Sequence, residues 1–280
     1  MTLPSVWASY ARMLVQRRPA LAPAGSRIEG AVLEAKDVVP DPGALAAYRR
    51  VCAFPEDGAL PATYGHALAN PLHLALITGP LFPVRFLGIV HLANTIRVLR
   101  PLPAGEPLDL RCTVEGPRET DRGQEFALVT ELRHDGELAW SEAALLLARK
   151  PGAGGGKKAP PPAPAEDPPP PLARWELPGD QGRRYARASG DWNPIHLSVP
   201  TARLFGFRQP IMHGMWSLAR CVAELGAPEG AFTIETAFKL PVLLPAAVTL
   251  HATREGSRMK FALKDGEGVK PHLTGTLGPG

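Results

Sequence analysis

The spacing of apolar residues predicts helices at several places along this chain. Residues 4–18 carry apolar side chains at helical spacing, and Pro42 is suited to open a short helix over residues 43–51. A third pattern covers residues 215–225, where apolar residues recur every three or four positions. Gly226 follows directly, and glycine commonly comes after the last residue of a helix. A helix with one buried face is therefore expected just before this glycine.

Other parts of the chain show patterns typical of strands. Residues 91–99 are rich in β-branched residues, and residues 108–115 alternate polar with apolar positions. The tripeptide His134-Asp135-Gly136 separates two further runs, and Asp-Gly is a strong hairpin signal. We expect strands at residues 27–39, 91–99, 108–115, 124–133 and 137–147, an extended segment at 60–68 and a short apolar helix at 72–78.

Residues 151–171 interrupt these patterns with nine prolines and most of a glycine run. Proline has no N–H to donate to a sheet, and such a segment has few apolar side chains to pack, so we expect a semi-extended linker. The chain then divides into a first domain over residues 1–150, a linker over 151–174 and a second domain over 175–280.

The two predicted domains repeat the same order of features, which indicates a tandem arrangement. The letters agree weakly, but the layout is consistent. Four matches support the repeat: residues 48–54 with 185–191, 71–74 with 211–214, 96–101 with 237–241, and Asp135-Gly136 with Asp265-Gly266.

Composition narrows the class of protein. The chain has 280 residues, 45% of them hydrophobic, with a formal net charge of +4 and a pI near 9.1. It has no basic run interleaved with aromatic residues, so no nucleic-acid partner is expected. The most apolar stretch, residues 67–90, is broken by three prolines, an arginine and a histidine, so no membrane span is expected.

The expected compartment is the cytoplasm. The three cysteines show no pairing or metal-ligand spacing, which is typical of a reduced protein. Residues 4–18 have some transit-peptide character, but an ordinary first helix fits better because serine is sparse and no cleavage pattern is evident.

Residues 185–215 carry more chemistry than a structural segment needs, and we interpret them as an active site. Asp191 and His196 are five positions apart, and on a continuous helix that spacing turns through about 500° and separates the two side chains. Asn193-Pro194 supplies a bend, since asparagine caps helices and proline favours the first helical position. Ser189-Gly190 adds a hydroxyl group and a permissive backbone position. Both side chains are therefore expected to point into one small space.

Gly214 supplies a complementary feature in the first turn of the helix expected before Gly226. Unpaired N–H groups point outward in a first turn, and the helix dipole favours negative charge there. A glycine also lets a ligand carbonyl approach the backbone closely. An enolate or oxyanion site requires donors of this kind.

Taken together, these motifs resemble the signature of the MaoC-like, R-specific enoyl-thioester hydratases. The match consists of Tyr185, Ser189-Gly190-Asp191, Asn193-Pro194-Ile195-His196, Ala202, Gly206-Phe207, Pro210-Ile211 and His213-Gly214-Met215. The resemblance implies an α+β double hot-dog fold, with two antiparallel sheets that each wrap around a central helix. It also implies reversible syn addition of water to a trans-2-enoyl thioester. Asp191 and His196 carry over as the catalytic pair, and the Gly214 amide as the donor that polarises the carbonyl, with no metal or other cofactor.

Further residues are expected to bind the substrate or shape its pocket. Ser189 and Asn193 shape the loop, Tyr185 packs at the pocket edge and Phe207 lies in the core. For His213 we favour a hydrogen-bonded structural role over catalysis. The substrate-binding candidates are Tyr185, Ser189, Asn193, Phe207, Arg208, His213, Met215 and Lys239.

The basic residues and the remaining histidines indicate less about the function than the motifs above. A coenzyme A phosphate would need a basic rim, for which Arg203, Arg208 and Lys239 are candidates. An acyl carrier protein would need a wider basic face. The six histidines other than His196 and His213 show no ligand spacing, and we assign them no role.

The expected function is that of a (3R)-hydroxyacyl-thioester dehydratase or trans-2-enoyl-CoA hydratase in fatty-acid-type metabolism. Its partner is an acyl-CoA or acyl-carrier-protein thioester. Where the second domain has Ser189-Gly190-Asp191, the first has Cys52-Ala53-Phe54, so only the second is expected to be catalytic while the first completes the acyl tunnel. The tandem chain is a pseudo-dimer that could pair again as a homodimer. The alternative function is a non-catalytic or thioesterase-like acyl-binding hot-dog protein.

Overall fold

The structure is a computed structural model that describes residues 3–150 and 170–280. Most of the predicted linker, residues 151–169, lies outside the described residues. Strand β6 starts at Ala173, two residues before the predicted start of the second domain, because residues 173–177 pair with strand β8.

Apart from residues 60–68, the helices and strands follow the predicted order, with ends that shift by a few residues. The helices are α1 (Val6–Val15), α2 (Pro42–Cys52), α3 (Tyr64–Ile77), α4 (Gln181–Ser189), the 3₁₀ turn η2 (Pro194–His196), α5 (Val199–Arg203) and α6 (Gly214–Leu225). The strands are β1 (Val32–Val38), β2 (Ile89–Val98), β3 (Leu108–Thr120), β4 (Gly123–His134), β5 (Glu137–Arg149), β6 (Ala173–Leu177), β7 (Phe232–Phe238), β8 (Ala246–Glu255), β9 (Arg258–Asp265) and β10 (Pro271–Pro279).

All ten strands form one antiparallel sheet, in the order β1-β3-β4-β5-β2-β7-β10-β9-β8-β6. The second half, β6 to β10, repeats the order of the first half about the central β2–β7 pair. That pair runs from Ala93 opposite Ala237 to Val98 opposite Phe232. The two predicted sheets therefore pair edge to edge through their inner strands and form one continuous sheet, which agrees with the predicted double hot-dog fold.

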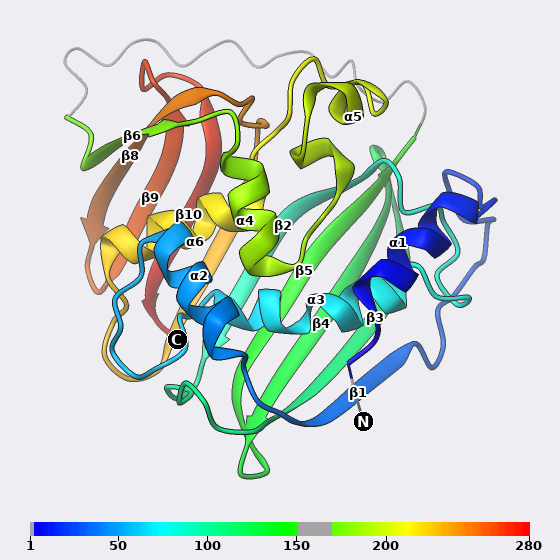
Figure 1. Ribbon diagram of the computed structural model, residues 1–280, viewed down its shortest axis with the longest axis horizontal. Helices are drawn as coiled ribbons and strands as arrows, with labels where there is room; N and C mark the ends of the chain where they lie inside the picture. The colour runs from blue at the N-terminus through cyan, green and yellow to red at the C-terminus, as the bar shows by residue number, and fades with distance from the viewer. Residues whose placement is uncertain (1–2, 151–169) are drawn as a thin grey trace.

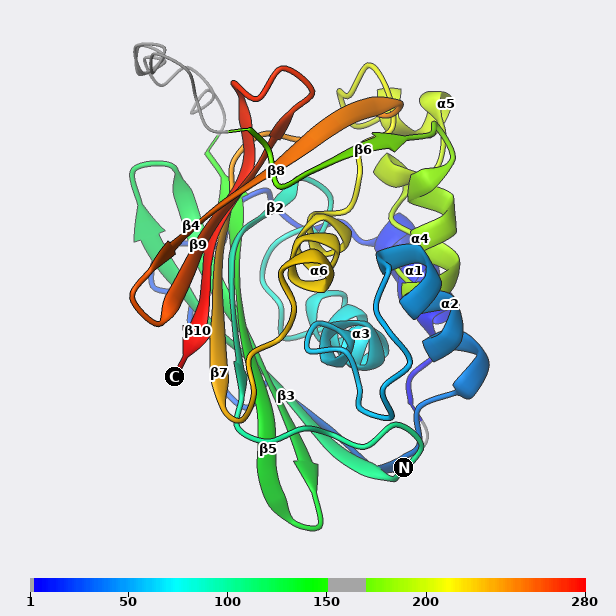
Figure 2. The same ribbon diagram turned by 90° about the vertical axis from the view of Figure 1, so that its left-hand side faces the viewer.

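Two helices lie under the curved sheet, one for each half. Figure 2 shows α3 and α6 end-on between the sheet and an outer layer formed by α1, α2 and α4. The elements of each half follow in sequence, blue to green for the first and green to red for the second (Figure 1). Each half thus has the hot-dog arrangement of a sheet wrapped around one helix, as the sequence predicted.

The prediction for residues 60–68 is wrong, since Tyr64 to Leu68 form the first part of helix α3. This helix is buried on nearly all sides, with Tyr64, Leu68 and Leu72 all below 9% exposure. It therefore has no polar face, and an apolar run without a polar face cannot be distinguished from a buried strand by periodicity. Pro71 inside the helix added to the error, because proline is typical of helix ends rather than helix interiors.

The repeat is confirmed at the outer helices. Helices α2 and α4 both end in a left-handed residue, Ala53 with φ 62° and Gly190 with φ 74°. Each lies five positions after a buried tyrosine, and the Tyr48 and Tyr185 rings pack 5.9 Å apart. Asp191 and Phe54 therefore occupy equivalent positions directly after equivalent caps.

One of the proposed matches within the repeat is wrong. Residues 71–74 lie well inside α3, whereas residues 211–214 precede and begin α6. The Asp-Gly matches hold, because Asp135-Gly136 and Asp265-Gly266 lie at the turns β4–β5 and β9–β10, which are equivalent in the two halves.

No helix within residues 3–150 and 170–280 is long and apolar enough to cross a membrane.

Candidate active site

Asp191 is held in a tight loop directly after helix α4. Gly190 caps the helix in the left-handed conformation, which glycine adopts without strain. The Asp191 N–H donates to Ser189 Oγ at 3.2 Å, and the Asn193 N–H donates to Asp191 Oδ1 at 3.1 Å. The carboxylate is therefore oriented by its own loop, with 38% of the side chain exposed.

His196 is placed by the turn that Asn193-Pro194 opens. Asn193 Oδ1 accepts the Ile195 N–H at 3.4 Å, with Pro194 at the first position of η2. His196 Nδ1 lies 2.7 Å from the carbonyl oxygen of Ile211, so Nδ1 carries the proton and the neutral ring keeps a lone pair on Nε2. Gly182 on α4 lets this turn pack closely, since a Cβ at that position would overlap the His196 carbonyl oxygen.

His213 and Gly214 complete the group. The His213 ring stacks on the His196 ring with centroids 3.6 Å apart, and its Nε2 lies 3.1 Å from the Asp191 carbonyl oxygen. A carboxylate oxygen of Asp191 and a ring nitrogen of each of His196 and His213 all lie within 4.8 Å of one another. Gly214 begins α6, so its N–H is among those without a partner inside the helix. The bend thus brings the predicted pair together beside this helix start.

Electrostatics favour an ionised carboxylate and neutral imidazoles. Burial opposes the charge of Asp191, yet the His213 and His196 rings and the Asn193 N–H hold the pKa of its carboxyl below the ordinary value. Burial lowers the pKa of His196 despite the opposing effect of Asp191. Burial and the nearby His196 lower the pKa of His213 to about 3. At neutral pH the site therefore holds one anion beside an unprotonated His196.

The structure also places Tyr10 at the candidate site, although the sequence predicted only that it belongs to an ordinary helix. The Tyr10 hydroxyl donates to Asp191 Oδ1 at 3.2 Å. Burial and the negative charge of Asp191 raise the pKa of Tyr10 well above 10, so the hydroxyl stays protonated and remains a donor. Trp7, on the same helix α1, packs against Trp192 with ring centroids 5.8 Å apart. Helix α1 therefore supports the Asp191 loop, and no local signal marks this contact across 181 positions.

Replacing Tyr10 by phenylalanine is expected to lower kcat about tenfold. A hydrogen bond to a charged group contributes about 1.5 to 3 kcal/mol, and the lower end applies to a carboxylate that is 38% exposed. Loss of the donor also raises the pKa of Asp191, so the acid limb of the kcat profile should move to higher pH. Steady-state kinetics across pH would measure both effects.

The matched control is Tyr48→Phe. It removes another buried tyrosine hydroxyl, which pairs with Thr63 Oγ1 at 2.9 Å in the first half of the chain. Equal losses of kcat in the two variants, with an unmoved acid limb in Tyr10→Phe, would mean that Tyr10 acts through packing alone.

The other candidates are placed as follows. Tyr185 is buried against the His213 ring at 4.8 Å, and Ser189 Oγ donates to the Tyr185 carbonyl at 2.9 Å. Met215 is buried in the hydrophobic core. The prediction that Phe207 lies in the core is wrong, because it is only partly buried in the loop after α5.

The basic candidates lie on the surface. Arg203, Arg208 and Lys239 are exposed, and their side chains form no ion pair with any other described residue. Arg203 ends α5, and Lys239 follows the last residue of β7. Their charges are therefore free to meet an anionic group of a ligand, but the structure does not bring them into contact with Asp191 or His196.

A groove of about 700 Å³ lies elsewhere, over strands β2 and β7 to β10. Its lining includes Ala93, Ala237, Ala262 and Thr274 and none of the predicted site residues. The chemistry of the chain is therefore concentrated at the Asp191 loop rather than at this groove.

Comparison with known proteins agrees with the family resemblance of the site residues. Residues 162–276 match the family described as "MaoC like domain". The chain is 32% identical over 279 residues, 99% of each chain, to 3-hydroxyacyl-thioester dehydratase X of Mycobacterium tuberculosis. It is 33% identical over 96 residues to peroxisomal enoyl-CoA hydratase 2 of Arabidopsis thaliana, covering 32% of this chain and 31% of that one.

Solved structures show the same fold. The crystal structure of HtdX from Mycobacterium tuberculosis has a TM-score of 0.78 and 31% identity, covering 88% of this chain and 98% of that one. A MaoC-like dehydratase from Phytophthora capsici has a TM-score of 0.69 at 18% identity, covering 89% and 93% of the two chains. The second similarity concerns the fold alone.

Proposed function

The chain belongs to the MaoC-like dehydratase family, and on this premise we propose that it is a hydro-lyase that interconverts (3R)-3-hydroxyacyl and trans-2-enoyl thioesters. The observation that carries the proposal is the convergence of Asp191 and His196 beside the start of α6, within 4.8 Å of one another. The relative that aligns over its whole length is named as a 3-hydroxyacyl-thioester dehydratase.

The reaction needs three contributions from the protein. A base must take a proton from Cα of the 3-hydroxyacyl thioester, an acid must protonate the departing hydroxyl, and donors must stabilise negative charge on the thioester oxygen. Because the elimination is syn, both proton transfers occur on one face of the substrate. A single residue can therefore carry the proton from Cα to the hydroxyl.

We assign the proton transfer to His196. Its Nδ1–H is engaged by the Ile211 carbonyl, which leaves Nε2 as the basic nitrogen. Nε2 takes the proton from Cα, and the electron pair moves onto the thioester oxygen as an enolate. The C–O bond at Cβ then breaks, and the proton on Nε2 passes to the leaving hydroxyl to form water. Hydration is the same path in reverse.

Asp191 and Gly214 support this path. The ionised Asp191 accepts a hydrogen bond from the hydroxyl group or the water and stabilises the imidazolium that forms on His196. The Gly214 N–H donates to the enolate oxygen, where the start of helix α6 also favours negative charge. Both groups thus act where charge develops during the reaction.

The first half, residues 1–150, is proposed to be non-catalytic. At the position equivalent to Asp191 it has Phe54, whose ring stacks on Tyr48 with centroids 6.3 Å apart. A phenyl ring can neither accept a proton nor hold a water molecule. The catalytic domain then begins with strand β6 at Ala173 and extends to residue 280, and the Pro/Gly-rich segment before it is the linker.

The finer features of the substrate and of the assembly are also proposals. The exposed Arg203, Arg208 and Lys239 suit the phosphates of coenzyme A better than a protein face, because they are separate charges rather than a broad basic surface. A cytoplasmic location and a homodimer formed from two such tandem chains remain part of this proposal.

The test is turnover of crotonyl-CoA, followed by loss of the enoyl-thioester absorbance and by chiral analysis of the product. The expected product is (3R)-3-hydroxybutyryl-CoA. If crotonyl-CoA, longer enoyl-CoA and carrier-protein thioesters are all left intact while acyl chains bind, the chain is an acyl-binding protein instead. Release of free thiol would indicate a thioesterase.

The pH dependence of kcat/KM gives a further prediction. Activity requires neutral His196, whose pKa lies below the ordinary 6.5, and ionised Asp191, whose pKa is also lowered. Both active forms persist as the pH falls until these lowered values are reached. The profile is therefore expected to be flat at neutral pH and to decline with an apparent pKa below 6.5. A decline centred above pH 7 would contradict the assignment of His196 as a neutral base.

A further inference from the structure

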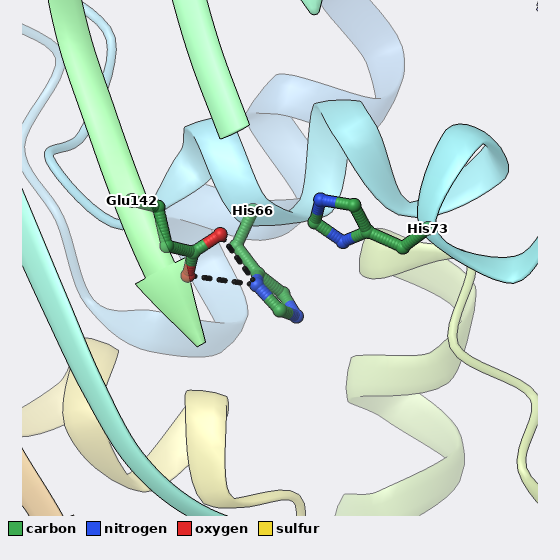
Figure 3. A group of neighbouring side chains, drawn as sticks. All are labelled: His66, His73 and Glu142. Atoms are coloured by element: carbon green, nitrogen blue, oxygen red, sulfur yellow. Dashed lines mark hydrogen bonds and ion pairs between the residues drawn. The ribbon is translucent and has the colours of Figure 1, made fainter. Parts of the chain in front are cut away.

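The first half of the chain holds a buried polar group that the proposed reaction does not use. His66 Nδ1 lies 2.8 and 2.9 Å from the two oxygens of Glu142, and Asn94 Nδ2 donates to Glu142 Oε1 at 2.5 Å. Figure 3 shows His66 and His73 on helix α3, with Glu142 facing His66 from strand β5. We call His66, Asn94 and Glu142, together with Asn70 one turn after His66 on α3, the polar cluster.

Glu142 and His66 each favour the charged form of the other. The Glu142 side chain is fully buried, and although burial opposes its charge, His66 and Asn94 lower the pKa of its carboxyl to about 2. Glu142 in turn raises the pKa of His66 against the effect of burial. When His66 is protonated, its Nδ1–H pairs with Glu142 and its Nε2–H remains as a further donor on a side chain that is 20% exposed.

Two amide atoms in the cluster have no partner among the described residues. These are Asn70 Nδ2 and Asn94 Oδ1, on residues that are 7% and 1% exposed. A buried polar atom without a hydrogen bond costs about 1 to 3 kcal/mol, so an unpaired donor and an unpaired acceptor in one cluster call for a ligand.

The cluster faces the active site. His66 and Asn70 are four positions apart on α3 and therefore share one face of that helix. On that face, Asn70 Nδ2 lies 3.3 Å from where a Cβ on Gly190 would be, directly before Asp191. The negative charge of Asp191 also helps to raise the pKa of His66.

A second path of contacts joins the cluster to the start of α6. The His91 ring lies 6.0 Å from the His66 ring and 4.8 Å from the Phe238 ring. Phe238 in turn packs against Gly214, where a Cβ would lie 2.9 Å from the phenyl ring. The polar cluster therefore lies beside the Asp191 loop and is linked to Gly214 through the His91 and Phe238 rings.

We infer that the polar cluster binds an oxygen function, hydroxyl or keto, on the acyl chain of the substrate, beyond its β-carbon. This inference rests on the proposed function and narrows its substrate class. Asn70 Nδ2 donates to that oxygen, as does His66 Nε2 when the ring is protonated, and a hydroxyl would also donate to Asn94 Oδ1. An unsubstituted chain would leave these groups unpaired, which disfavours it.

A metal ion fits this group less well. A ring nitrogen of each of His66 and His73 and a carboxylate oxygen of Glu142 lie within 4.8 Å of one another. However, His66 and Glu142 already satisfy each other, and His73 Nε2 lies 2.7 Å from Thr130 Oγ1. The atoms that lack partners belong to the asparagines, and amides are weak ligands for metals that prefer imidazole.

The test compares chains of equal length that differ only in the oxygen. Probes are trans-2-hexenoyl-CoA and its 5-hydroxy and 5-oxo derivatives, with crotonyl-CoA as the reference for turnover. The wild-type kcat/KM is expected to favour an oxygenated chain about tenfold or more, and Asn70→Leu should reduce that ratio to about one. The two derivatives distinguish a hydroxyl from a keto group.

His73→Gln is the matched control, since His73 lies on the same helix yet has its ring nitrogen engaged by Thr130; it should keep the wild-type ratio. A wild-type preference for the plain chain, or a ratio unchanged in Asn70→Leu, would overturn the inference. Calorimetric binding of 5-hydroxyhexanoyl-CoA and hexanoyl-CoA gives the same comparison without turnover. A lack of turnover of crotonyl-CoA would then reject the proposed function without deciding the cluster.

Discussion

Replacing His196 by glutamine is expected to reduce kcat on crotonyl-CoA by about a thousandfold or more, since a positioned acid–base group contributes about 10² to 10⁴ in rate. Glutamine can keep a hydrogen bond to the Ile211 carbonyl but offers no basic nitrogen for the Cα proton. Asp191→Asn should give a loss of similar size, because an amide neither stabilises the imidazolium nor has the carboxylate's charge. The double variant should be little worse than either single one, as expected of residues that act together.

The control for this prediction is His134→Gln. His134 is as buried as His196, at 8% exposure, and also contacts a carboxylate, with Nε2 2.8 Å from Glu106. It belongs to strand β4 of the first half, outside the catalytic group. Thermal unfolding and kcat should be measured for both variants. A His196→Gln protein that keeps more than a tenth of the wild-type kcat would rule out His196 as the residue that transfers the proton.

Replacing Gly214 by proline is expected to lower kcat about 100-fold or more, because it removes the N–H assigned to the enolate oxygen. The backbone should tolerate this change. Gly214 is the first residue of α6, where proline is favoured, and His213 before it has φ −63° and ψ 133°, a conformation compatible with a following proline.

Gly214→Ala separates the N–H from the bulk of a side chain. Alanine and proline both place a Cβ 2.9 Å from the Phe238 ring, so both need that ring to shift, but alanine keeps the N–H. The alanine variant should therefore lose much less kcat than the proline variant. Equal losses would mean that the crowding of Phe238, and not the N–H, determines the effect.

Much of the candidate site is determined by short stretches of sequence. The Asn193-Pro194 turn, the glycine cap before Asp191 and the start of α6 each depend on residues within a few positions of one another. Such local preferences act whatever the rest of the chain does. The bend between Asp191 and His196 could therefore be predicted with no knowledge of the fold.

Helix α3 could not be predicted correctly from the local pattern of polar and apolar residues. Its surroundings are the sheet on one side and outer helices on the other, so burial on nearly all faces removed the polar stripe that identifies a helix. With α3 divided between an extended segment and a short helix, His66 and Asn70 could not be seen to share a face. The polar cluster could therefore not be predicted from the sequence.

The sequence by itself determined the Asp191 loop and the helix start at Gly214, since each follows from contacts between near neighbours in the chain, and it indicated the tandem hot-dog fold through its repeated order of features and its resemblance to a known family. The tertiary structure alone decided which distant groups meet there: Tyr10 with Asp191, Asn70 beside Gly190, and strand β2 with β7. The physical reason is that these contacts depend on how whole helices and strands pack, and a packing partner more than a hundred positions away leaves no trace in the local pattern of polar and apolar residues.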